Sequence, residues 1–402
     1  MEERIRARYR IETPLAAAKA AEFIAGEQST GTFTRIPGET DELRERHGAR
    51  VESVTDIGDG ASIVELSWPL SNMGPSLPNL LAAVSGNLWE MKQFTALRLL
   101  DLELPAAFLE RYCGPQFGVA GTRRLCGVYG RPVIGTIIKP SVGLGPEETA
   151  GVVRKLVEGG IDFIKDDELQ SDGPHCPFHE RLAAVMRVIN DHAGRTGKKV
   201  MYAANITGEI DEMLRRHDQV VAHGGTCVMV SIHSIGLPGL AALRRHCAVA
   251  IHGHRNGWGL YGRSPAIGYS FVAWQKFWRL AGIDHVHVNG LANKFCEPDE
   301  SVIASARECL KPMFAPPNKG CEIMPVFSSG QSARQAEPTY RALGGTDLIF
   351  ACGGGIMAHP GGVAAGVRSL RQAWAAAVQG IPVADYARTH PELRAALEKF
   401  QK

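Results

Sequence analysis

Apolar and polar residues alternate one by one at the start of the chain. The pattern covers four apolar positions separated by three arginines: Ile5, Ala7, Tyr9 and Ile11. Because successive side chains of a strand point to opposite faces, this period of two predicts a half-buried strand. A helix-forming run over 15–29 follows Pro14, and strand-like stretches at 49–54, 61–68 and 96–104 flank a helix at 79–89. The order β-α-β-β-α-β indicates a ferredoxin-like α+β domain, which we place at residues 1–112.

From about residue 115 the pattern changes to apolar runs that end in polar residues and alternate with helical stretches. There are eight such runs: 132–140, 163–168, 199–207, 226–232, 248–255, 285–290, 322–330 and 348–355. Buried parallel strands read as near-continuous apolar runs, and eight of them with intervening helices make a (β/α)8 TIM barrel. We therefore predict an α/β chain in which a barrel domain at 113–402 follows the N-terminal domain.

Composition narrows the class of protein. Of 402 residues, 45% are hydrophobic and 21% are charged, as in ordinary globular proteins, and the net charge of +2 argues against a nucleic-acid partner. The nine cysteines include no CxxC pair, which indicates reduced thiols rather than a disulfide framework. No stretch reaches the roughly 18 apolar residues of a membrane span. We expect a cytoplasmic protein with a small-molecule partner and no membrane association.

Catalytic groups of such barrels lie at the C-terminal ends of the strands, where several runs here end in reactive side chains. These residues are Lys139, Lys165, Asp167, Glu168, Asn205, Thr207, His252, His254, Arg255, His287, Ser328, Ser329, Gly353, Gly354 and Gly355. Any one of them could simply cap a loop, but together they favour an active site. The glycines, with Ser328, Gly330 and Arg255, suggest a ligand that is anionic at both ends.

The lysines of this set allow two interpretations each. Lys165 beside Asp167 and Glu168 could form a salt bridge, or, once CO2 converts its amine to a carbamate, an oxygen site for a hard cation. Lys139 could act as an acid or base next to a carbonyl, because a nearby cation and desolvation favour its neutral form. The alternative is a barrel-rim lysine with its ammonium group in solvent.

Eight motifs in order resemble the large subunit of RuBisCO, and more closely the RuBisCO-like proteins, along nearly the whole chain. They are EQSTGTF (27–33), SGN (85–87), GTIIKP (135–140), GGIDFIKDDE (159–168), HGHR (252–255), DHVHVNG (284–290), PVFSSG (325–330) and GGG with HP (353–360). The resemblance implies Mg2+ held by carbamylated Lys165, Asp167 and Glu168, with CO2 supplying the carbamate. It also implies an acid-base role for Lys139.

The same resemblance implies roles for the remaining site residues. His254 would contact substrate hydroxyls, and Lys294 holds the position of the mobile-loop lysine. One anion site would comprise Arg255, His287 and Ser328, and the other Thr32, Gly330, Gly354 and Gly355. Glu27, Thr32 and Asn87 correspond to residues that reach the barrel mouth of a partner subunit, which implies a homodimer with shared active sites and a phosphorylated keto-sugar substrate.

Departures from the carboxylase pattern argue against ribulose bisphosphate carboxylation. Ser141 stands where carboxylases have a second lysine, Trp258 replaces a histidine, Phe33 a tryptophan and Ser329 a glycine. Retention of Asn87, Arg255 and His287 argues against the methionine-salvage enolases of the family. Retention of Lys139 and of the metal ligands argues against a non-catalytic sugar-phosphate binding protein.

Lys294 directs the choice among the remaining reactions. In carboxylases this lysine stabilises a carboxylate beside an enediolate, and loss of CO2 from a 3-oxo acid needs the same stabilisation. We therefore expect a decarboxylase or transcarboxylase/hydrolase acting on 3-oxo-isoapionate 4-phosphate or a close analogue, whose phosphate and carboxylate would fit two anion sites.

Overall fold

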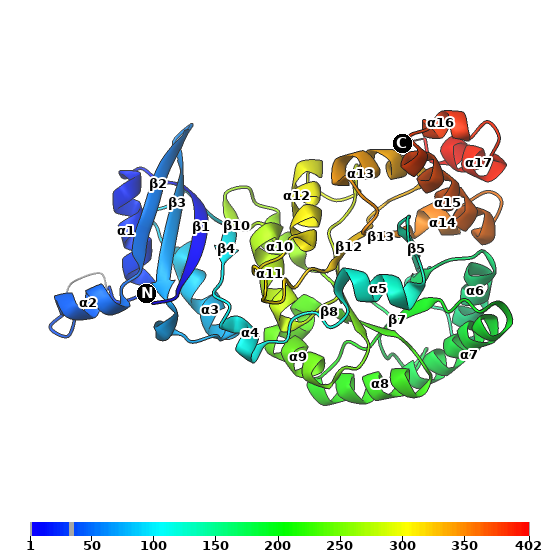
Figure 1. Ribbon diagram of the computed structural model, residues 1–402, viewed down its shortest axis with the longest axis horizontal. Coiled ribbons are helices and arrows are strands. Elements are labelled where there is room, and N and C mark those ends of the chain that lie inside the picture. The colour runs from blue at the N-terminus through cyan, green and yellow to red at the C-terminus, as the bar shows by residue number, and fades with distance from the viewer. Residues whose placement is uncertain (1, 32–35, 402) are drawn as a thin grey trace. The chain divides into compact units, whose positions relative to one another are not determined.

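The computed structural model describes residues 2–31 and 36–401, which form two compact units (Figure 1). The first comprises the chain up to Gly114 together with Gly257–Ala281 and Pro312–Cys321. The second comprises Pro115–Asn256, Gly282–Lys311 and the chain from Glu322 onward. The predicted boundary between residues 112 and 113 stays a prediction.

The first unit contains a mixed sheet with helices. Its elements are β1 (Arg4–Glu12), α1 (Ala17–Glu27), α2 (Asp41–His47), β2 (Arg50–Gly58), β3 (Ala61–Pro69), η1 (Leu70–Asn72), α3 (Leu77–Val84), η2 (Leu88–Glu90), β4 (Ala96–Glu103), α4 (Phe108–Arg111), α10 (Trp258–Gly262), β10 (Ile267–Tyr269) and α11 (Phe271–Ala281). The predicted order of strands and helices is present. Helix α2 and strand β10 are additions that the sequence pattern did not predict.

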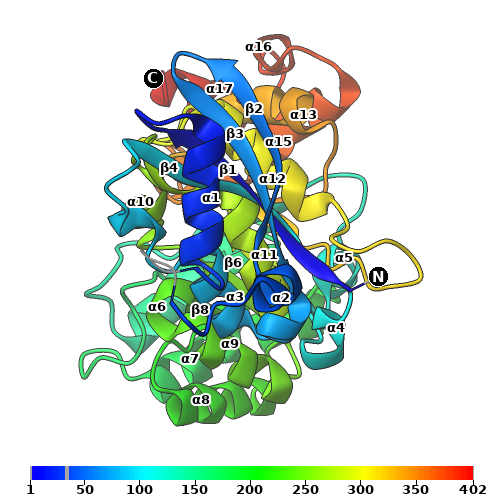
Figure 2. The ribbon, with the colours of Figure 1, turned by 90° about the vertical axis from the view of Figure 1, so that its left-hand side faces the viewer.

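Strand β1 lies at the centre of the sheet, whose order is β10-β4-β1-β3-β2. It pairs antiparallel with β3 and β4, and β10 joins β4 in parallel. The apolar residues of its period-two pattern are buried, as predicted. Helix α1 packs on β2 and β3, as Figure 2 shows, and the Tyr9 hydroxyl donates to the carbonyl of Val84 (2.6 Å), which ties β1 to the end of α3. The ferredoxin-like arrangement is thus confirmed.

The second unit alternates strands and helices. Its elements are α5 (Gly118–Cys126), β5 (Val133–Ile137), α6 (Pro146–Glu158), β6 (Phe163–Lys165), α7 (Phe178–Thr196), β7 (Met201–Asn205), α8 (Ile210–Ala222), β8 (Cys227–Ser231), α9 (Ile232–His246), β9 (Ala250–His254), β11 (His285–His287), α12 (Asp299–Leu310), β12 (Met324–Phe327), η3 (Ala333–Gln335), α13 (Ala336–Leu343), β13 (Ile349–Ala351), α14 (Gly354–Met357), α15 (Val363–Gln379), α16 (Val383–Tyr386) and α17 (Pro391–Lys399).

Eight parallel strands of this unit close into a barrel, one from each predicted apolar run. They follow one another around the barrel in chain order, and β9 pairs with β11 because β10 belongs to the other sheet. Helices surround the strands in Figure 1. Alternate residues of the strands fill the interior, from Val133 and Phe163 to Ile349 and Ala351. The TIM barrel prediction is confirmed.

Two buried aspartates connect neighbouring barrel strands at their N-terminal ends through hydrogen bonds and ion pairs. Asp162, just before β6, accepts the backbone N–H of Ile134 (3.0 Å) and pairs with Arg131, Lys198 and Arg371. Asp284, just before β11, accepts the N–H of Ile251 (2.9 Å) and pairs with a buried arginine of α9, Arg244 (3.1 Å). Each carboxylate joins neighbouring strands, so the bottom of the barrel is held by charge as well as by apolar packing.

Two general expectations can be compared with this structure. None of the helices within 2–31 and 36–401 is both long and apolar enough to cross a lipid bilayer. All nine cysteines are free thiols, seven of them buried, in agreement with the absence of a disulfide framework expected from their spacing.

Candidate active site

The C-terminal ends of the barrel strands bring the predicted residues to one edge of the barrel. Lys139 follows β5, Lys165 ends β6, and His254 ends β9. His287 ends β11, and Ser328 follows β12. Parallel strands place their carboxyl ends at the same rim, so residues far apart in the sequence become neighbours here.

Lys165 lies at the centre of the acidic group and is fully buried. Its Nζ donates to the carbonyl of Asp166 (2.7 Å) and lies 3.3 Å from Oε2 of Glu168. Burial lowers the pKa of the Lys165 amine, while Glu168 and Asp167 oppose that shift. A buried amine with a lowered pKa is more often neutral, and the neutral amine is the form that combines with CO2.

Glu168 also faces His254, whose Nε2 lies 3.4 Å from its Oε2. Burial alone would raise the pKa of Glu168, but His254 and Lys165 bring it down to about 2. Burial and the charge of Lys165 lower the pKa of His254 to about 4. At neutral pH the carboxylate is therefore ionised and the imidazole is neutral, so the ring can accept a proton from a substrate hydroxyl.

Lys139 lies on the other side of the acidic group. Its Nζ lies 2.6 Å from Oδ2 of Asp167 and donates to the hydroxyl of Ser141 (2.8 Å). The Lys139 side chain is 41% exposed, whereas that of Asp167 is 2% exposed. The ammonium group can thus reach a molecule in the barrel mouth while the carboxylate below it stays fixed, since its Oδ1 accepts the N–H of Leu169 (3.1 Å).

The donor set fits a hard divalent cation. The carboxylate of Asp167 lies beside Nζ of Lys139, and that of Glu168 lies beside Nζ of Lys165. Carbamylation of Lys165 would replace a cationic group with an anionic oxygen donor, which gives three oxygen-bearing side chains of the kind that Mg2+ prefers. Water or substrate oxygens would supply the other ligands of the cation.

The structure brings together the three residues of the first predicted anion site, but Arg255 has a partner that sequence reasoning missed. His287 Nδ1 lies 2.8 Å from Oγ of Ser328, and both side chains are buried. Arg255 forms a buried ion pair with Glu297, which lies in the segment between β11 and α12. An acid three residues beyond Lys294 was the only sequence signal, and it does not by itself specify a partner.

The second predicted anion site includes glycines that follow β12 and β13, of which Gly330 lies beside Lys294. Gly330 has a positive φ of 91°, and a Cβ there would lie 3.5 Å from Cβ of Lys294. The Lys294 N–H donates to the carbonyl of Ser329 (3.1 Å), and its side chain is exposed. Gly354 begins the short helix α14, and a Cβ on Gly355 would lie 2.5 Å from the carbonyl oxygen of Gln331. Thr32 lies outside the described residues.

The other two N-terminal candidates contact each other in the first unit. Asn87, at the start of η2, donates from Nδ2 to Oε1 of Glu27 (3.2 Å), the last residue of α1. This pairing holds an amide and a carboxylate together at one end of α1.

Comparison with known proteins places this arrangement in a family. The family model for the ribulose bisphosphate carboxylase large chain, catalytic domain, matches residues 118–400, and the model for its N-terminal domain matches residues 2–108. The chain belongs to the RuBisCO large-chain family. Within that family it is a RuBisCO-like protein by its similarity to the relatives described next.

Three relatives are similar over almost the whole chain. The 3-oxo-isoapionate-4-phosphate transcarboxylase/hydrolase of Xanthobacter autotrophicus is 56% identical, with 99% of each chain covered. The 3-oxo-isoapionate-4-phosphate decarboxylase of Rhizobium etli is 47% identical, with 98% of this chain and 97% of the relative covered. The crystal structure of a rubisco-like protein from Burkholderia fungorum superposes with a TM-score of 0.91 at 44% identity, covering 99% of this chain and 100% of that one.

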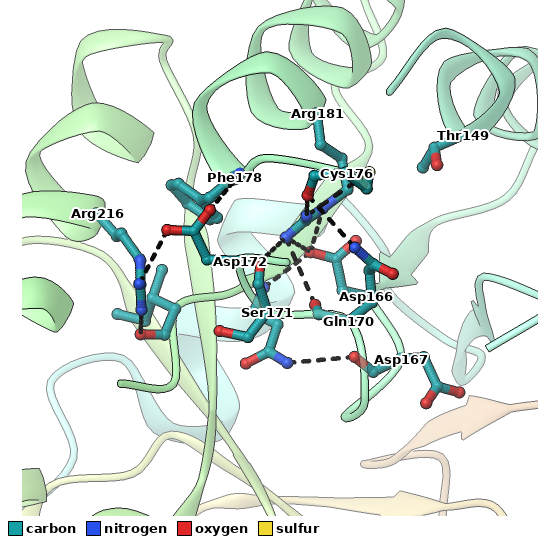
Figure 3. Close-up of polar contacts among 12 residues, drawn as sticks. Thr149, Asp166, Asp167, Gln170, Ser171, Asp172, Cys176, Phe178, Arg181 and Arg216 are labelled. Atoms are coloured by element: carbon teal, nitrogen blue, oxygen red, sulfur yellow. Dashed lines mark hydrogen bonds and ion pairs between the residues drawn. The ribbon is translucent and has the colours of Figure 1, made fainter. Parts of the chain in front are cut away.

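Arg181 of this RuBisCO-like protein is a site-supporting residue that sequence reasoning did not identify. Figure 3 shows its guanidinium group among the residues that follow β6. It pairs with Asp166 (3.2 Å) and donates to the carbonyls of Cys176 (3.1 Å) and Ser171 (2.7 Å). Asp166 also accepts from the Tyr202 hydroxyl (2.6 Å). A cation on the apolar face of α7 was the available signal, because a buried arginine needs partners.

A second group of possible metal ligands in this RuBisCO-like protein lies on α8 and α9, away from the predicted set. The ligand atoms of His217, Asp218 and His246 lie within 4.8 Å of one another. His217 Nε2 accepts the N–H of Ala248 (3.0 Å), so the proton of the neutral ring is on Nδ1, facing Asp218 (2.9 Å). Since neither ring nitrogen of His217 is left to bind an ion, the group is a hydrogen-bonded link between two helices.

Proposed function

We propose that the protein is a cytoplasmic, Mg2+-dependent transcarboxylase/hydrolase of 3-oxo-isoapionate 4-phosphate. The carboxyl group would leave one carbon as CO2, the resulting enediolate would take up that CO2 at its other carbon, and water would then cleave the bond between these two carbons to give two carboxylic acids. The observation that carries this proposal is the 56% identity to the Xanthobacter autotrophicus transcarboxylase/hydrolase over both full chains. Two ion pairs at the ends of β5 and β6 support it, because Lys139 lies beside Asp167 and Lys165 lies beside Glu168, which offers acid-base and cation-binding groups on neighbouring strands.

The carbon–carbon bond of a 3-oxo acid breaks when CO2 leaves and the electron pair of that bond stays on the substrate as an enediolate. Bound Mg2+ would supply charge that polarises the carbonyl and hydroxyl oxygens of the substrate, and Lys165, Asp167 and Glu168 would hold the ion. Nζ of Lys139 donates to the fixed carboxylate of Asp167 and would deliver or remove a proton at the reacting carbon or its oxygen. His254 would orient a neighbouring hydroxyl group.

The two anion sites would bind the two ends of the substrate. Arg255 offers a cation and Ser328, which contacts His287, offers a hydroxyl donor on one side of the mouth. On the other side, Gly330, Gly354 and Gly355 allow close approach of an anion to the backbone. We assign the phosphate to one and the carboxylate to the other. The exposed ammonium group of Lys294 would stabilise the negative charge of the carboxylate while the bond between that group and its carbon breaks.

Ser141 distinguishes this reaction from ribulose bisphosphate carboxylation. Its hydroxyl accepts a hydrogen bond from Lys139 at the position where carboxylases have a second lysine. The site therefore has one cation fewer beside the acid-base lysine. With that charge missing, we do not expect fixation of free CO2 on ribulose bisphosphate.

A substrate carrying 13C in its carboxyl group tests the proposal. The enzyme is incubated with Mg2+ and bicarbonate, and 13C NMR follows the label. Retention of the label in a carboxylic acid product, with cleavage of another carbon–carbon bond, supports transcarboxylation and hydrolysis. No turnover of this substrate, with turnover of a methylthio-diketo phosphate, would contradict the proposal and favour a salvage enolase. Tight binding without any product would indicate a non-catalytic protein.

Decarboxylation is the second candidate, because the Rhizobium etli decarboxylase is 47% identical over nearly the whole chain. It predicts that the label leaves as CO2 and that a ketose phosphate accumulates in equal amount. The same experiment therefore separates the two candidates by where the labelled carbon is found.

We also propose that two copies of the chain form a homodimer with shared active sites. The family resemblance supports this arrangement for Glu27 and Asn87, which form a polar pair at one end of α1. In such a dimer these two residues would act at the barrel mouth of the partner subunit.

A further inference from the structure

Four histidines of β9 and β11 point into the barrel, because they occupy alternate positions on neighbouring strands. They are His252, His254, His285 and His287. The proposed function uses the two at the mouth and leaves His252 and His285 without a role. Both of these are fully buried, and the His252 ring packs beside Phe163 with 5.2 Å between ring centroids.

His285 shows how a buried imidazole of this barrel is satisfied. The Thr122 hydroxyl donates to the carbonyl of Gly118 (2.5 Å), so its oxygen accepts from His285 Nε2 (2.8 Å). The ring proton is therefore on Nε2. Its Nδ1 has no hydrogen-bond partner among the described residues and keeps only a lone pair. An unsatisfied acceptor is tolerated in a protein interior more readily than an unsatisfied N–H.

The same reasoning applies to His252. Its Nε2 lies 2.8 Å from Nε2 of His287, so one of these nitrogens donates and the other accepts. If His287 donated, the His252 proton would be on Nδ1, which has no hydrogen-bond partner within the described part of the chain. If His252 donates, its Nδ1 carries only a lone pair. The second arrangement avoids a buried N–H without an acceptor.

We propose that His252 is a positioning residue that donates to Nε2 of His287 and so holds the His287 proton on Nδ1, facing Ser328. This inference deepens the proposed function, because it rests on His287 and Ser328 belonging to a substrate anion site. Ser328 Oγ then accepts from His287 Nδ1 (2.8 Å), and its own hydroxyl proton remains available to an oxygen of the substrate. In the opposite tautomer His287 Nδ1 would take that proton as an acceptor.

The neighbouring polar groups are compatible with this direction. The Ser329 hydroxyl donates to Oδ1 of Asn289 (2.8 Å), so it does not compete for the acceptor position on Ser328. Its oxygen is 3.4 Å from that of Ser328, a long contact that a phosphate or carboxylate oxygen could replace. Burial also lowers the pKa of both His252 and His287, which keeps both rings neutral.

The first test is the tautomer of His287 in the wild-type protein without substrate. Nitrogen-15 NMR of protein labelled in its histidine rings distinguishes a protonated from an unprotonated ring nitrogen, and a His287→Gln variant assigns the signals. We expect His287 to have an unprotonated Nε2 and a protonated Nδ1. A protonated Nε2 on His287 would overturn the inference. Turnover by the wild-type protein separately tests the proposed function.

Two variants of similar size test the donor itself. His252→Leu removes the ring N–H, whereas His252→Gln keeps an amide N–H close to the position of Nε2. We expect His252→Leu to raise KM about tenfold with a smaller change in kcat, and to shift the nitrogen-15 signal of the unprotonated His287 Nε2, which loses its hydrogen bond, while His252→Gln retains the wild-type signature. Equal behaviour of the two variants would overturn the inference.

His285→Leu is the matched control for a purely structural effect. It removes a second fully buried imidazole of the same barrel, whose Nε2 contacts Thr122 rather than the anion site. We expect it to lower stability while leaving the His287 tautomer and KM within about twofold of the wild type. If it shifted the His287 Nε2 signal and KM as much as His252→Leu, the effect would be structural and the inference would be wrong.

Discussion

Lys139 is the residue on which the proposed proton transfer depends. Its ammonium group lies between the carboxylate of Asp167 and the hydroxyl of Ser141, and its side chain remains partly open to the barrel mouth. We expect Lys139→Ala to lower kcat by about 100- to 10,000-fold with little effect on folding. The exposed lysine on α6, in a Lys155→Ala variant, is the control and should keep wild-type activity. A near wild-type rate for Lys139→Ala would remove this residue from the chemistry.

Lys165 carries the prediction for metal and CO2. Removal of divalent ions with EDTA should abolish activity, and Mg2+ with bicarbonate should restore it. The carbamate should add about 44 Da at this lysine and give a 13C signal when labelled bicarbonate is used. A Lys165→Ala variant should lose this signal and should bind Mg2+ more weakly by calorimetry. Full activity in the absence of both metal and modification would contradict the assignment.

Single residues of the site could be predicted where chemistry and position in a strand agreed. The grouping of Lys165, Asp167 and Glu168 followed from their adjacency at the end of one strand and from the family resemblance. The ion pair of Arg255 with Glu297 could not be predicted, because it depends on the path of an irregular loop. The roles of the resemblance-based residues remain proposals.

At the scale of elements, the bottom of β6 gives a prediction about stability. Burial raises the pKa of Asp162, but Arg131 and Lys198 outweigh it and lower the pKa below the usual 3.8. A lowered pKa in the folded state means that this carboxylate stabilises the fold above about pH 4, and that the stabilisation is lost as the pH falls through the folded pKa.

We therefore expect Asp162→Asn to lower the free energy of unfolding by about 2 kcal/mol at pH 7, because three partly exposed cations and the N–H of Ile134 lose their ionised acceptor. The stability of the variant should fall less than that of the wild type between pH 5 and pH 3, an interval of about two units around the ordinary aspartate pKa. Urea unfolding measures both. Asp385→Asn, at an exposed pair with Arg388, should change stability by less than about 0.5 kcal/mol.

The elements that could be predicted from the sequence are those with a strong period. The eight barrel strands each contain several buried residues in succession, and β1 alternates strictly, so packing follows from the pattern. Strand β10 was not predicted, because only Gly268 and Tyr269 of its three residues are buried and it pairs with β4 rather than with its neighbours in the chain. Helix α2 contains no buried residue, so no apolar face indicates it.

At the scale of the whole molecule, the proposed dimer predicts complementation between inactive subunits. Lys139→Ala damages the barrel, and Asn87→Ala damages the N-terminal unit. If active sites are shared, a purified hybrid of these two subunits contains one intact site and should have about half of the wild-type activity per dimer. Two affinity tags on co-expressed chains isolate the hybrid.

The control is a hybrid of Lys139→Ala with Lys165→Ala. Both substitutions lie in the barrel, so neither barrel of that hybrid is intact and activity should stay at the level of the single variants. An inactive Lys139→Ala and Asn87→Ala hybrid, despite normal assembly by size-exclusion chromatography, would contradict sharing of sites between subunits.

The adjacent acids Asp166 and Asp167 have separate duties. Asp166 is committed to Arg181 and Tyr202 in the interior, whereas Asp167 faces Lys139 at the barrel mouth. A relative without catalytic activity could therefore lose Asp167 and still fold. Loss of Asp166 would require a different structure of the loop around Arg181. A relative that keeps Asp166 but lacks Asp167 would therefore be expected to fold without being catalytically active, and these two positions of its sequence would be enough to recognise it.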